Sequence, residues 1–246
     1  MLTDIQYRIL KAISPRNPDS GECAYEGKSK LTTLLGNDFL TRIRGKTVID
    51  FGCGHGDAAI EMANGGATRV IGIDIREDYL QTARQKALTA DVQNNCLFAS
   101  STKELADIVV SIDSFEHFAN PAGILHIMGT LLRPAGEICV SFGPTWYHPL
   151  GGHMFSVFPW AHLLFSEEAL LRWRSTFKTD GATRFSDVPG GLNQMTVRKF
   201  EQLIKDSEFT LATLELVPIR KLRLVHNRLT REFTTATVRC RLVKGK

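Results

Sequence analysis

A hydrophobic run at residues 48–51 contains Asp50 and leads directly into a loop with glycine at every second position from Gly52 to Gly56. Glycine at such a junction lets the backbone approach a ligand closely and adopt a positive φ. The dinucleotide-binding pattern G-x-G-x-x-G is absent, because its third glycine would fall at Asp57 or Ala59. The loop therefore predicts a cradle for a nucleotide-like ligand and disfavours a NAD site.

Two more acidic side chains follow strand-like runs. Asp74 closes the run 69–73 and stands 22 residues after Gly52. A crossover helix and a second strand would deliver a carboxylate there, where it can accept hydrogen bonds from both hydroxyls of a ribose. The alternative is an N-cap for a helix at 76–88, and one acid can serve both purposes. The other acid, Asp113, follows the run 106–112.

Strand-like and helix-like segments alternate through most of the chain, and the strands are nearly continuous apolar runs. This pattern predicts an α/β fold with a doubly wound, mostly parallel, seven-stranded Rossmann-like sheet and helices on both faces. The predicted strands are 46–52, 69–74, 95–100, 106–112, 136–142, 211–219 and 234–243. The predicted helices are 1–13, 29–42, 57–64, 76–88, 121–132 and two that begin after the capping residues Ser166 and Thr196.

The Asp50-x-Gly-x-Gly-x-Gly56 loop, Asp74 and the Asp113–His117 segment resemble the motifs of class I S-adenosylmethionine (SAM)-dependent methyltransferases, over roughly residues 25–245. The resemblance implies SAM as the cofactor and S-adenosylhomocysteine as its product. It assigns Asp50 and the loop backbone to the methionine part of SAM, Asp74 to the ribose, and Asp113 to a place beside the methyl donor. The complete set of implied cofactor-binding residues is Asp50, Gly52, Cys53, Gly54, Asp74, Ile75, Ser100, Ser101 and Asp113. Within that set Ile75 would pack on the adenine, and Ser100 or Ser101 would bind its amine, by backbone or hydroxyl.

The segment Asp113-x-x-Glu116-His117 is similar to an acid-x-x-Glu-His pattern of ubiquinone-pathway O-methyltransferases and small-RNA 2′-O-methyltransferases, some of which bind a divalent metal. A metal held by Asp113, Glu116 and His117 is one interpretation, since it would lower the pKa of an acceptor hydroxyl. The preferred interpretation has no metal, with Asp113, His117 and His153 as the catalytic side chains and one of the histidines as general base.

An inserted segment at residues 144–165 follows the fifth predicted strand and is dense in aromatic, His, Pro and Gly residues. Ligands of open α/β sheets bind at the carboxyl ends of strands, so this segment predicts an acceptor pocket or lid. Its imidazoles are those of His148, His153 and His162. The aromatic side chains expected to line it are Trp146, Tyr147, Phe155, Phe158 and Trp160.

Length and composition fit one domain at 1–246, with residues 1–44 as an N-terminal helical cap. No apolar run approaches the ~20 residues of a membrane span, and five scattered cysteines indicate reduced thiols in a cytoplasmic protein. The net charge is +4, and residues 220–246 contain nine basic residues and one acid. These charges alternate with apolar residues as in a strand, which favours a solvated sheet face over a nucleic-acid site.

The sequence thus predicts a methyltransferase that acts on a small molecule, with O-methylation favoured over N- or C-methylation. An RNA methyltransferase that uses the basic C-terminal strands is one alternative. A non-catalytic SAM-binding partner subunit is another. The Asn/Asp-Pro-Pro-Tyr/Phe signature of enzymes that methylate amino groups of nucleic acids is absent after the fourth predicted strand. Acceptor and oligomeric state stay open.

Overall fold

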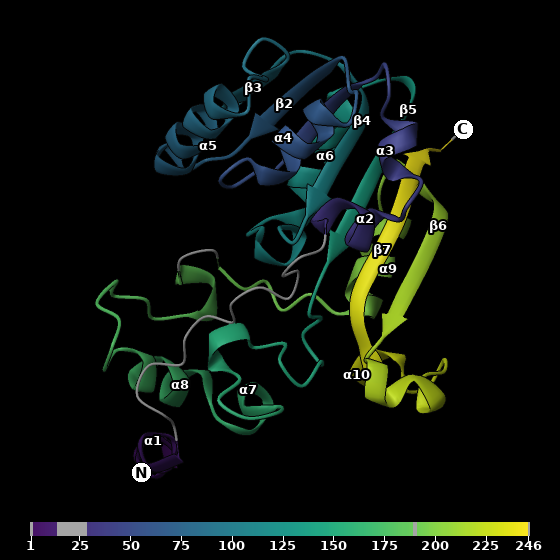
Figure 1. Cartoon of the computed structure of the whole chain (residues 1–246). Coiled ribbons are helices and arrows are strands. Elements are labelled where there is room, and N and C mark those ends of the chain that lie inside the picture. Colours follow the sequence, from purple (N-terminus) through teal and green to yellow (C-terminus); the bar gives the residue numbers. More distant parts are fainter. Residues whose placement is uncertain (1, 14–28, 189–190, 246) are drawn as a thin grey trace.

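The computed structural model describes residues 2–13, 29–188 and 191–245, and its described part contains one seven-stranded sheet of order β3-β2-β1-β4-β5-β7-β6 (Figure 1). The six other strands run parallel to one another and β7 runs antiparallel to both of its neighbours. This confirms the predicted doubly wound fold. The strands are β1 (Thr47–Phe51), β2 (Arg69–Ile73), β3 (Cys96–Ala99), β4 (Ala106–Ile112), β5 (Leu132–Phe142), β6 (Phe209–Pro218) and β7 (Thr235–Lys244).

Helices cover both faces of this sheet, as Figure 1 shows. One face packs against α2 (Lys30–Leu35), α3 (Phe39–Arg42), α4 (Asp57–Asn64) and α5 (Glu77–Thr89). The other face packs against α6 (Pro121–Thr130) and α9 (Val197–Lys205). Central strands buried on both sides need apolar side chains at nearly every position, which is why their sequences read as continuous hydrophobic runs.

Local capping explains where several helices begin. The side chain of Asn120 accepts a hydrogen bond from the backbone N–H of Gly123 at the start of α6. Thr196 does the same for α9, and Ser166 for α8 (Glu167–Arg174). Such caps satisfy N–H groups that the first helical turn leaves without partners, so these boundaries are encoded locally.

The N-terminal prediction needs a correction at residues 29–42. The segment forms two short helices, α2 and α3, rather than one. Gly36 ends α2 with a φ of +97°, which a right-handed helix does not contain. The sheet also differs in detail, because β5 begins at Leu132 and is longer than predicted. The predicted break after residue 13, Cys23 and Tyr25 lie outside the described residues.

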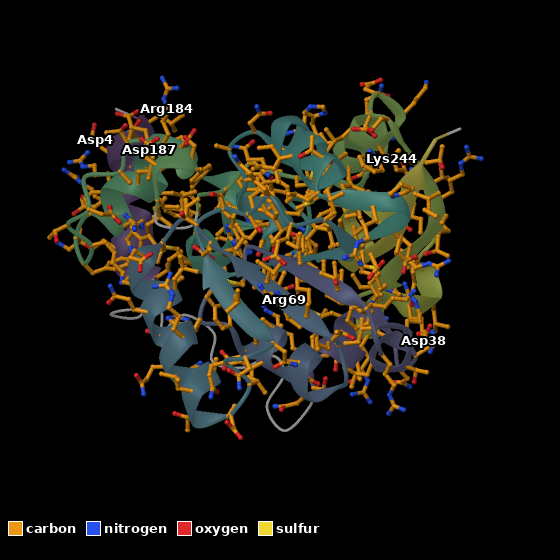
Figure 2. The ribbon with its side chains drawn as sticks, turned by 90° about the horizontal axis from the view of Figure 1, so that it is seen from above. Asp4, Asp38, Arg69, Arg184, Asp187 and Lys244 are labelled. Carbon is orange, nitrogen blue, oxygen red and sulfur yellow. The ribbon has the colours of Figure 1, made fainter. Side chains whose placement is uncertain are left out.

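A third apolar cluster lies apart from the sheet and joins α1 (Leu2–Ile13), α8 and the 3₁₀ helix η3 (Phe185–Asp187) to the inserted segment. The inserted segment contains η2 (His153–Phe155) and α7 (Ala161–Leu164). In Figure 2, Asp4 of α1 lies on the same side of the molecule as Asp187, opposite Lys244 at the end of β7. Only Leu10 of α1 is fully buried, while Ile5, Ile9 and Ile13 face solvent.

The basic residues near the C-terminus do not all lie on a sheet face, which corrects the prediction. Arg239, Arg241 and Lys244 belong to β7. Five others lie in the connection between β6 and β7, which contains η4 (Arg220–Val225) and α10 (Arg231–Thr234).

The four cysteines in the described part of the chain are free, and Cys96, Cys139 and Cys240 are buried. These three buried cysteines are therefore core thiols, as predicted. Among the described residues, no helix is both long and apolar enough to cross a lipid bilayer.

Candidate active site

The predicted site residues converge where the strand order reverses, between β1 and β4. Beyond the carboxyl end of β1 lies the glycine loop, and beyond that of β4 lies Asp113, followed by η1 (Phe115–His117). Open α/β sheets bind ligands in the crevice outside this switch point. The topology thus brings together groups that are far apart in sequence.

The glycine loop is held by the neighbouring strand β2. The backbone N–H groups of Gly52 and Cys53 both donate to the carbonyl oxygen of Ile73, at 2.8 and 3.0 Å. The N–H of Gly54 donates to Oδ2 of Asp74 at 2.9 Å, and Oδ1 of Asp74 accepts from the N–H of Arg76. Asp74 therefore fixes the loop and caps the turn into α5, and its remaining lone pairs are available to a ligand.

The glycines at 52 and 54 have different roles. A Cβ at Gly52 would lie 2.6 Å from Oγ of Ser114, so this glycine permits close packing of the loop on the segment after β4. A Cβ at Gly54 would meet no atom of residues 2–13, 29–188 or 191–245 within 4 Å, although the φ of Gly54 is +53°. A closely bound ligand requires open space over a backbone turn with fixed N–H groups. The turn at Gly54 provides both.

Asp50 lies beneath the loop and is almost completely buried. Its Oδ2 has no hydrogen-bond partner among the residues that the structure describes. Burial raises the pKa of Asp50 to about 7; the Lys30 ammonium opposes this rise and the Asp74 carboxylate adds to it. A buried carboxylate without a full set of partners is costly, so a positively charged ligand at this position would be stabilised.

Lys30 is a site residue that the sequence analysis missed. Its Nζ lies 2.9 Å from Oδ2 of Asp113, and α2 begins at this lysine after the Ser29 cap. Asp113 has a φ of +47° and its N–H donates to the carbonyl of Ser141 on β5. No local pattern separates Lys30 from other lysines, because its partner is 83 residues away in sequence.

Glu116, His117 and His153 form the second half of the site, with ligand-type atoms of all three within 4.8 Å of one another. The rings of His117 and His153 stack with centroids 5.1 Å apart. Burial, and then the charge of Asp113, raise the pKa of Glu116 to about 8. Burial lowers the pKa of His153 to about 4, so its imidazole is neutral at pH 7.

The chain also fixes the tautomer of His117. Its Nδ1 lies 2.7 Å from the carbonyl oxygen of Gly191. A carbonyl only accepts, so Nδ1 carries the proton and Nε2 is free to accept one. The side chain of Asn193 supports this arrangement by donating to the carbonyls of Phe115 and Phe118, at the two ends of η1. Asn193 is also a residue that the sequence analysis missed.

The histidines of the inserted segment divide into two kinds. His162 is buried, with Nε2 placed 2.7 Å from the Trp146 carbonyl and Nδ1 placed 3.2 Å from Ser156 Oγ. Nδ1 of His148 accepts from the N–H of Leu150 in the same turn. Both therefore stabilise the segment itself, and only His153 joins the cluster.

The predicted acceptor pocket needs a correction, because two of the aromatic side chains expected to line it pack inside the inserted segment. Phe155 is fully buried in the third cluster, where it packs on Phe185. Trp146 packs on Phe185 and on the ring of His162. The cavity between Glu116, Trp146 and His153 measures only about 10 Å³. These two aromatic rings thus build the core of the segment instead of lining an open pocket.

The residues predicted to meet adenine are exposed on the β2 and β3 side of the glycine loop, away from the cluster that follows β4. Ile75 is 94% exposed, and Ser100 and Ser101 follow the end of β3 in solvent. The N–H of Asp74 donates to the carbonyl of Ala99, which places these serines next to the β2 end. An apolar side chain so exposed beside a carboxylate offers a surface for a flat ring.

The donor set at the second half of the site also fits a divalent cation. Oε2 of Glu116 and Nδ1 of His153 are buried atoms that have no hydrogen-bond partner within the described part of the chain. A carboxylate and two imidazoles suit a borderline transition metal. A bound cation would act as a Lewis acid on the acceptor oxygen. Asp113, which the sequence pattern had included in such a ligand set, is not part of the group that converges here.

Comparison with known proteins agrees with this geometry. Residues 43–145 match the family model described as a methyltransferase domain. The ubiquinone biosynthesis O-methyltransferase of Neisseria meningitidis serogroup C is 37% identical over 106 residues, which cover 40% of this chain and 44% of that protein. The chain thus spans less than half the length of the curated relatives it matches.

Solved structures extend the likeness to the fold. A [4+2]-cyclase has a TM-score of 0.58 and 12% identity, with coverage of 99% of this chain and 93% of that one. The magnesium protoporphyrin IX methyltransferase of Synechocystis PCC 6803, solved with bound SAM, has a TM-score of 0.52 and 17% identity, over 84% and 75% of the two chains. The chain is thus similar to methyltransferases in sequence over residues 43–145, and over most of its length it shares the fold of a SAM-binding methyltransferase.

Gly→Ala substitutions at Gly52 and Gly54 separate the roles of these two loop glycines. The same substitution at Gly45, outside the loop, is the control. Gly45 (φ +71°) and Gly54 have positive φ and open space, so each variant should lose about 1–2 kcal/mol of unfolding free energy from backbone strain. Gly52→Ala adds a steric overlap with Ser114 and should lose roughly 3 kcal/mol. Gly54→Ala alone should also weaken SAM binding, by about tenfold or more. Denaturant unfolding and calorimetric titration measure these effects, and equal SAM affinity of the Gly45 and Gly54 variants would contradict the assigned cradle.

The pKa of Asp50 predicts how SAM binding depends on pH. Below pH 7 the buried carboxyl holds a proton, and a cationic ligand must displace it, whereas above pH 7 the group is already ionised. SAM affinity should therefore rise about tenfold from pH 6 to pH 8. Asp50→Asn should bind SAM more weakly with a flatter pH profile. Calorimetric titration across this range is the measurement, and an unchanged profile in the variant would assign the titration to another group.

Proposed function

We propose that this chain is a SAM-dependent methyltransferase that methylates an oxygen atom of a small-molecule acceptor. The observation that carries the proposal is the position of the Glu116–His117–His153 cluster. Glu116 and His117 follow β4, next to the strand end that bears the glycine loop, and His153 joins them from the inserted segment after β5. The name of the curated relatives, ubiquinone biosynthesis O-methyltransferase, supports oxygen as the atom methylated, on the 40% of the chain that they match.

The proposed cofactor fits the first half of the site. SAM, when bound, supplies an electrophilic methyl group on a positively charged sulfur and leaves as S-adenosylhomocysteine. Asp50 and Asp113 would provide the negative field that favours this charge, and Asp74 would accept hydrogen bonds from the ribose hydroxyls. Lys30 would meet the carboxylate of the methionine part, with Ile75, Ser100 and Ser101 at the adenine.

Proton removal is assigned to the second half of the site. An acceptor hydroxyl becomes a better nucleophile as its proton leaves, and Nε2 of His117 is the free acceptor for that proton. The Gly191 carbonyl accepts from Nδ1–H and stabilises the imidazolium that forms. Neutral His153 and Asp113 would position the acceptor. Positioning itself contributes to the rate, since methyl transfer requires an in-line approach.

Several finer predictions remain proposals of the same kind. They are one domain at 1–246, an N-terminal helical cap at 1–44 and a cytoplasmic location. An RNA acceptor is less favoured, because the basic residues of the C-terminal region do not gather along a strand face as that alternative required. A metal at Glu116, His117 and His153 is the mechanistic alternative to a histidine base.

Methyl-labelled SAM incubated with the protein and a metabolite extract tests the proposal. We expect label in a small molecule, with or without EDTA. Label found only in RNA would support the rival acceptor, and no transfer to any acceptor would support a non-catalytic SAM-binding subunit. Activity that EDTA abolishes and a divalent cation restores would assign the cluster to a metal.

His117→Ala tests the proposed base. Removal of a general base lowers kcat by about 10²–10⁴-fold, and SAM binding should stay unchanged because the cofactor half is untouched. His126→Ala is the matched control, since His126 is exposed on α6. The rate of label transfer under saturating SAM is measured from pH 6 to pH 9. The fall in kcat should extend across this pH range, and a kcat as high as that of the His126 variant would exclude His117 as the base.

A further inference from the structure

The connection between β6 and β7, residues 219–233, is an exposed segment without a role in the proposed reaction. It contains η4 and α10 and joins the end of the edge strand β6 to the start of its neighbour β7 (Figure 1). The N–H of Ile219 donates to the Thr234 carbonyl, and Nδ1 of His226 lies 2.7 Å from Thr234 Oγ1. These bonds and the long β6–β7 ladder hold the segment in a defined shape.

The apolar side chains of this segment point into solvent. Leu224 is completely exposed and Leu229 is 93% exposed. Val225 and Phe233 are each about half exposed. Single exposed leucines are common on protein surfaces, but four apolar side chains within ten residues form a group whose burial would be favourable.

Exposed basic side chains neighbour this apolar group in the sequence. Arg220, Lys221, Arg223 and Arg228 are all exposed, and within the described part of the chain none of the four has an acidic partner at ion-pair distance. Arg231, by contrast, is engaged by Glu201. The segment holds five basic residues and one acid, so its own net charge of +4 equals the formal net charge of the whole chain.

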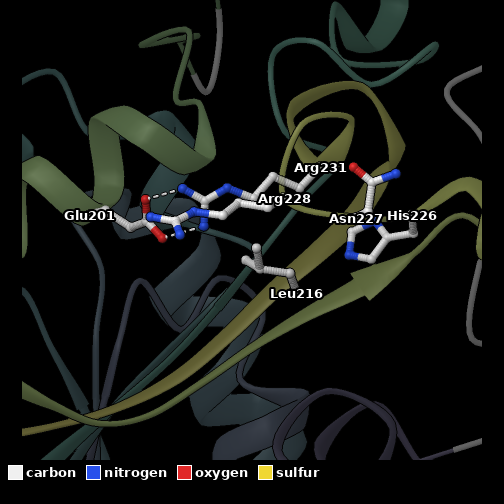
Figure 3. A pocket seen from close by; sticks show the side chains of 6 residues that line it. All are labelled: Glu201, Leu216, His226, Asn227, Arg228 and Arg231. Carbon is white, nitrogen blue, oxygen red and sulfur yellow. Dashed lines mark hydrogen bonds and ion pairs between the residues drawn. The ribbon is translucent and has the colours of Figure 1, made fainter.

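A pocket of about 560 Å³ opens beneath the same segment, as Figure 3 shows. The guanidinium of Arg231 donates two hydrogen bonds of 2.6 Å to the Glu201 carboxylate, which neutralises the one acid of the pocket. Arg228 and the side chains of His226 and Asn227 complete its polar lining. An arginine with neighbouring hydrogen-bond donors suits an anionic phosphate ester.

We propose that residues 219–233 dock on the surface of an anionic lipid bilayer. Exposed leucines interspersed with basic residues are the composition of interfacial membrane segments, where apolar tips enter the acyl boundary and cations attract acidic headgroups. Nucleic acid would satisfy the charges but leave the leucines in water. A second copy would cover the leucines but bring two positively charged segments together.

The position of the segment connects the bilayer surface with the acceptor side of the site. The ring of Phe233 stacks on Tyr147 of the inserted segment, with centroids 5.1 Å apart. Docking would therefore hold the inserted segment next to the bilayer, where an amphiphilic acceptor could enter. This consequence rests on the proposed function, whereas the docking itself does not.

Co-sedimentation with phosphatidylcholine vesicles, with and without phosphatidylglycerol, tests the docking. We expect binding only to vesicles that contain phosphatidylglycerol, and weaker binding at high salt. Each basic residue changed to Gln among Arg220, Lys221 and Arg223 should lower the partition coefficient about fivefold. The double variant Leu224→Ser/Leu229→Ser should lower it about tenfold or more. Leu88→Ser/Leu105→Ser, at exposed leucines elsewhere, should leave it unchanged.

Circular dichroism melts establish that the variants fold, and SAM binding provides a second control that is independent of lipid. A Leu224→Trp variant should show a blue shift of emission with anionic vesicles. Three results would overturn the proposal. They are equal binding to neutral vesicles, retention of an RNA oligonucleotide that the leucine variant does not weaken, and concentration-dependent dimerisation that the leucine variant abolishes.

Discussion

The active site concentrates acidic groups at one edge of the sheet, and their mutual repulsion is the constraint that the rest of the site must satisfy. Burial raises the pKa of both Asp50 and Glu116, and the charges of Asp74 and Asp113, respectively, raise these pKa values further. Lys30 opposes both effects and contacts Asp113 directly. Parallel strands bring these carboxyl groups together because their carboxyl ends lie side by side. A cationic ligand would relieve the repulsion, and this links the fold to the choice of a sulfonium cofactor.

Much of this arrangement could be predicted from the sequence because its signals are local. The buried parallel strands are apolar along their full length, and α4 and β4 have the predicted bounds, residues 57–64 and 106–112. The caps at Asn120, Ser166 and Thr196 mark helix starts through a bond to a backbone N–H three residues ahead. The acids follow strand ends, so their convergence follows from topology once the strand order is known.

Other features depend on contacts between distant parts of the chain, and no local pattern contains them. Lys30 enters the site through its pairing with Asp113, and Asn193 through the carbonyls of η1. The aromatic residues of the inserted segment suggested a pocket, yet Phe155 packs against Phe185 and forms a core. Aromatic content alone does not distinguish these outcomes, because both need large apolar surfaces. Likewise, Leu224 and Arg223 alternate as in a strand but lie in a 3₁₀ helix.

The amide of Asn193 has a consequence for how this site could be altered. The region that matches the methyltransferase family model ends at residue 145, and the inserted segment and the return to α9 lie beyond it. The two carbonyls that Asn193 binds are on the matched side of that boundary. A transplant of residues 146–195 from another protein would thus exchange the inserted segment and His153 as one cassette, while Glu116 and His117 would stay. Such a cassette would have to carry its own donor for the turn after β4, or the imidazole of His117 would lose the backbone that orients it.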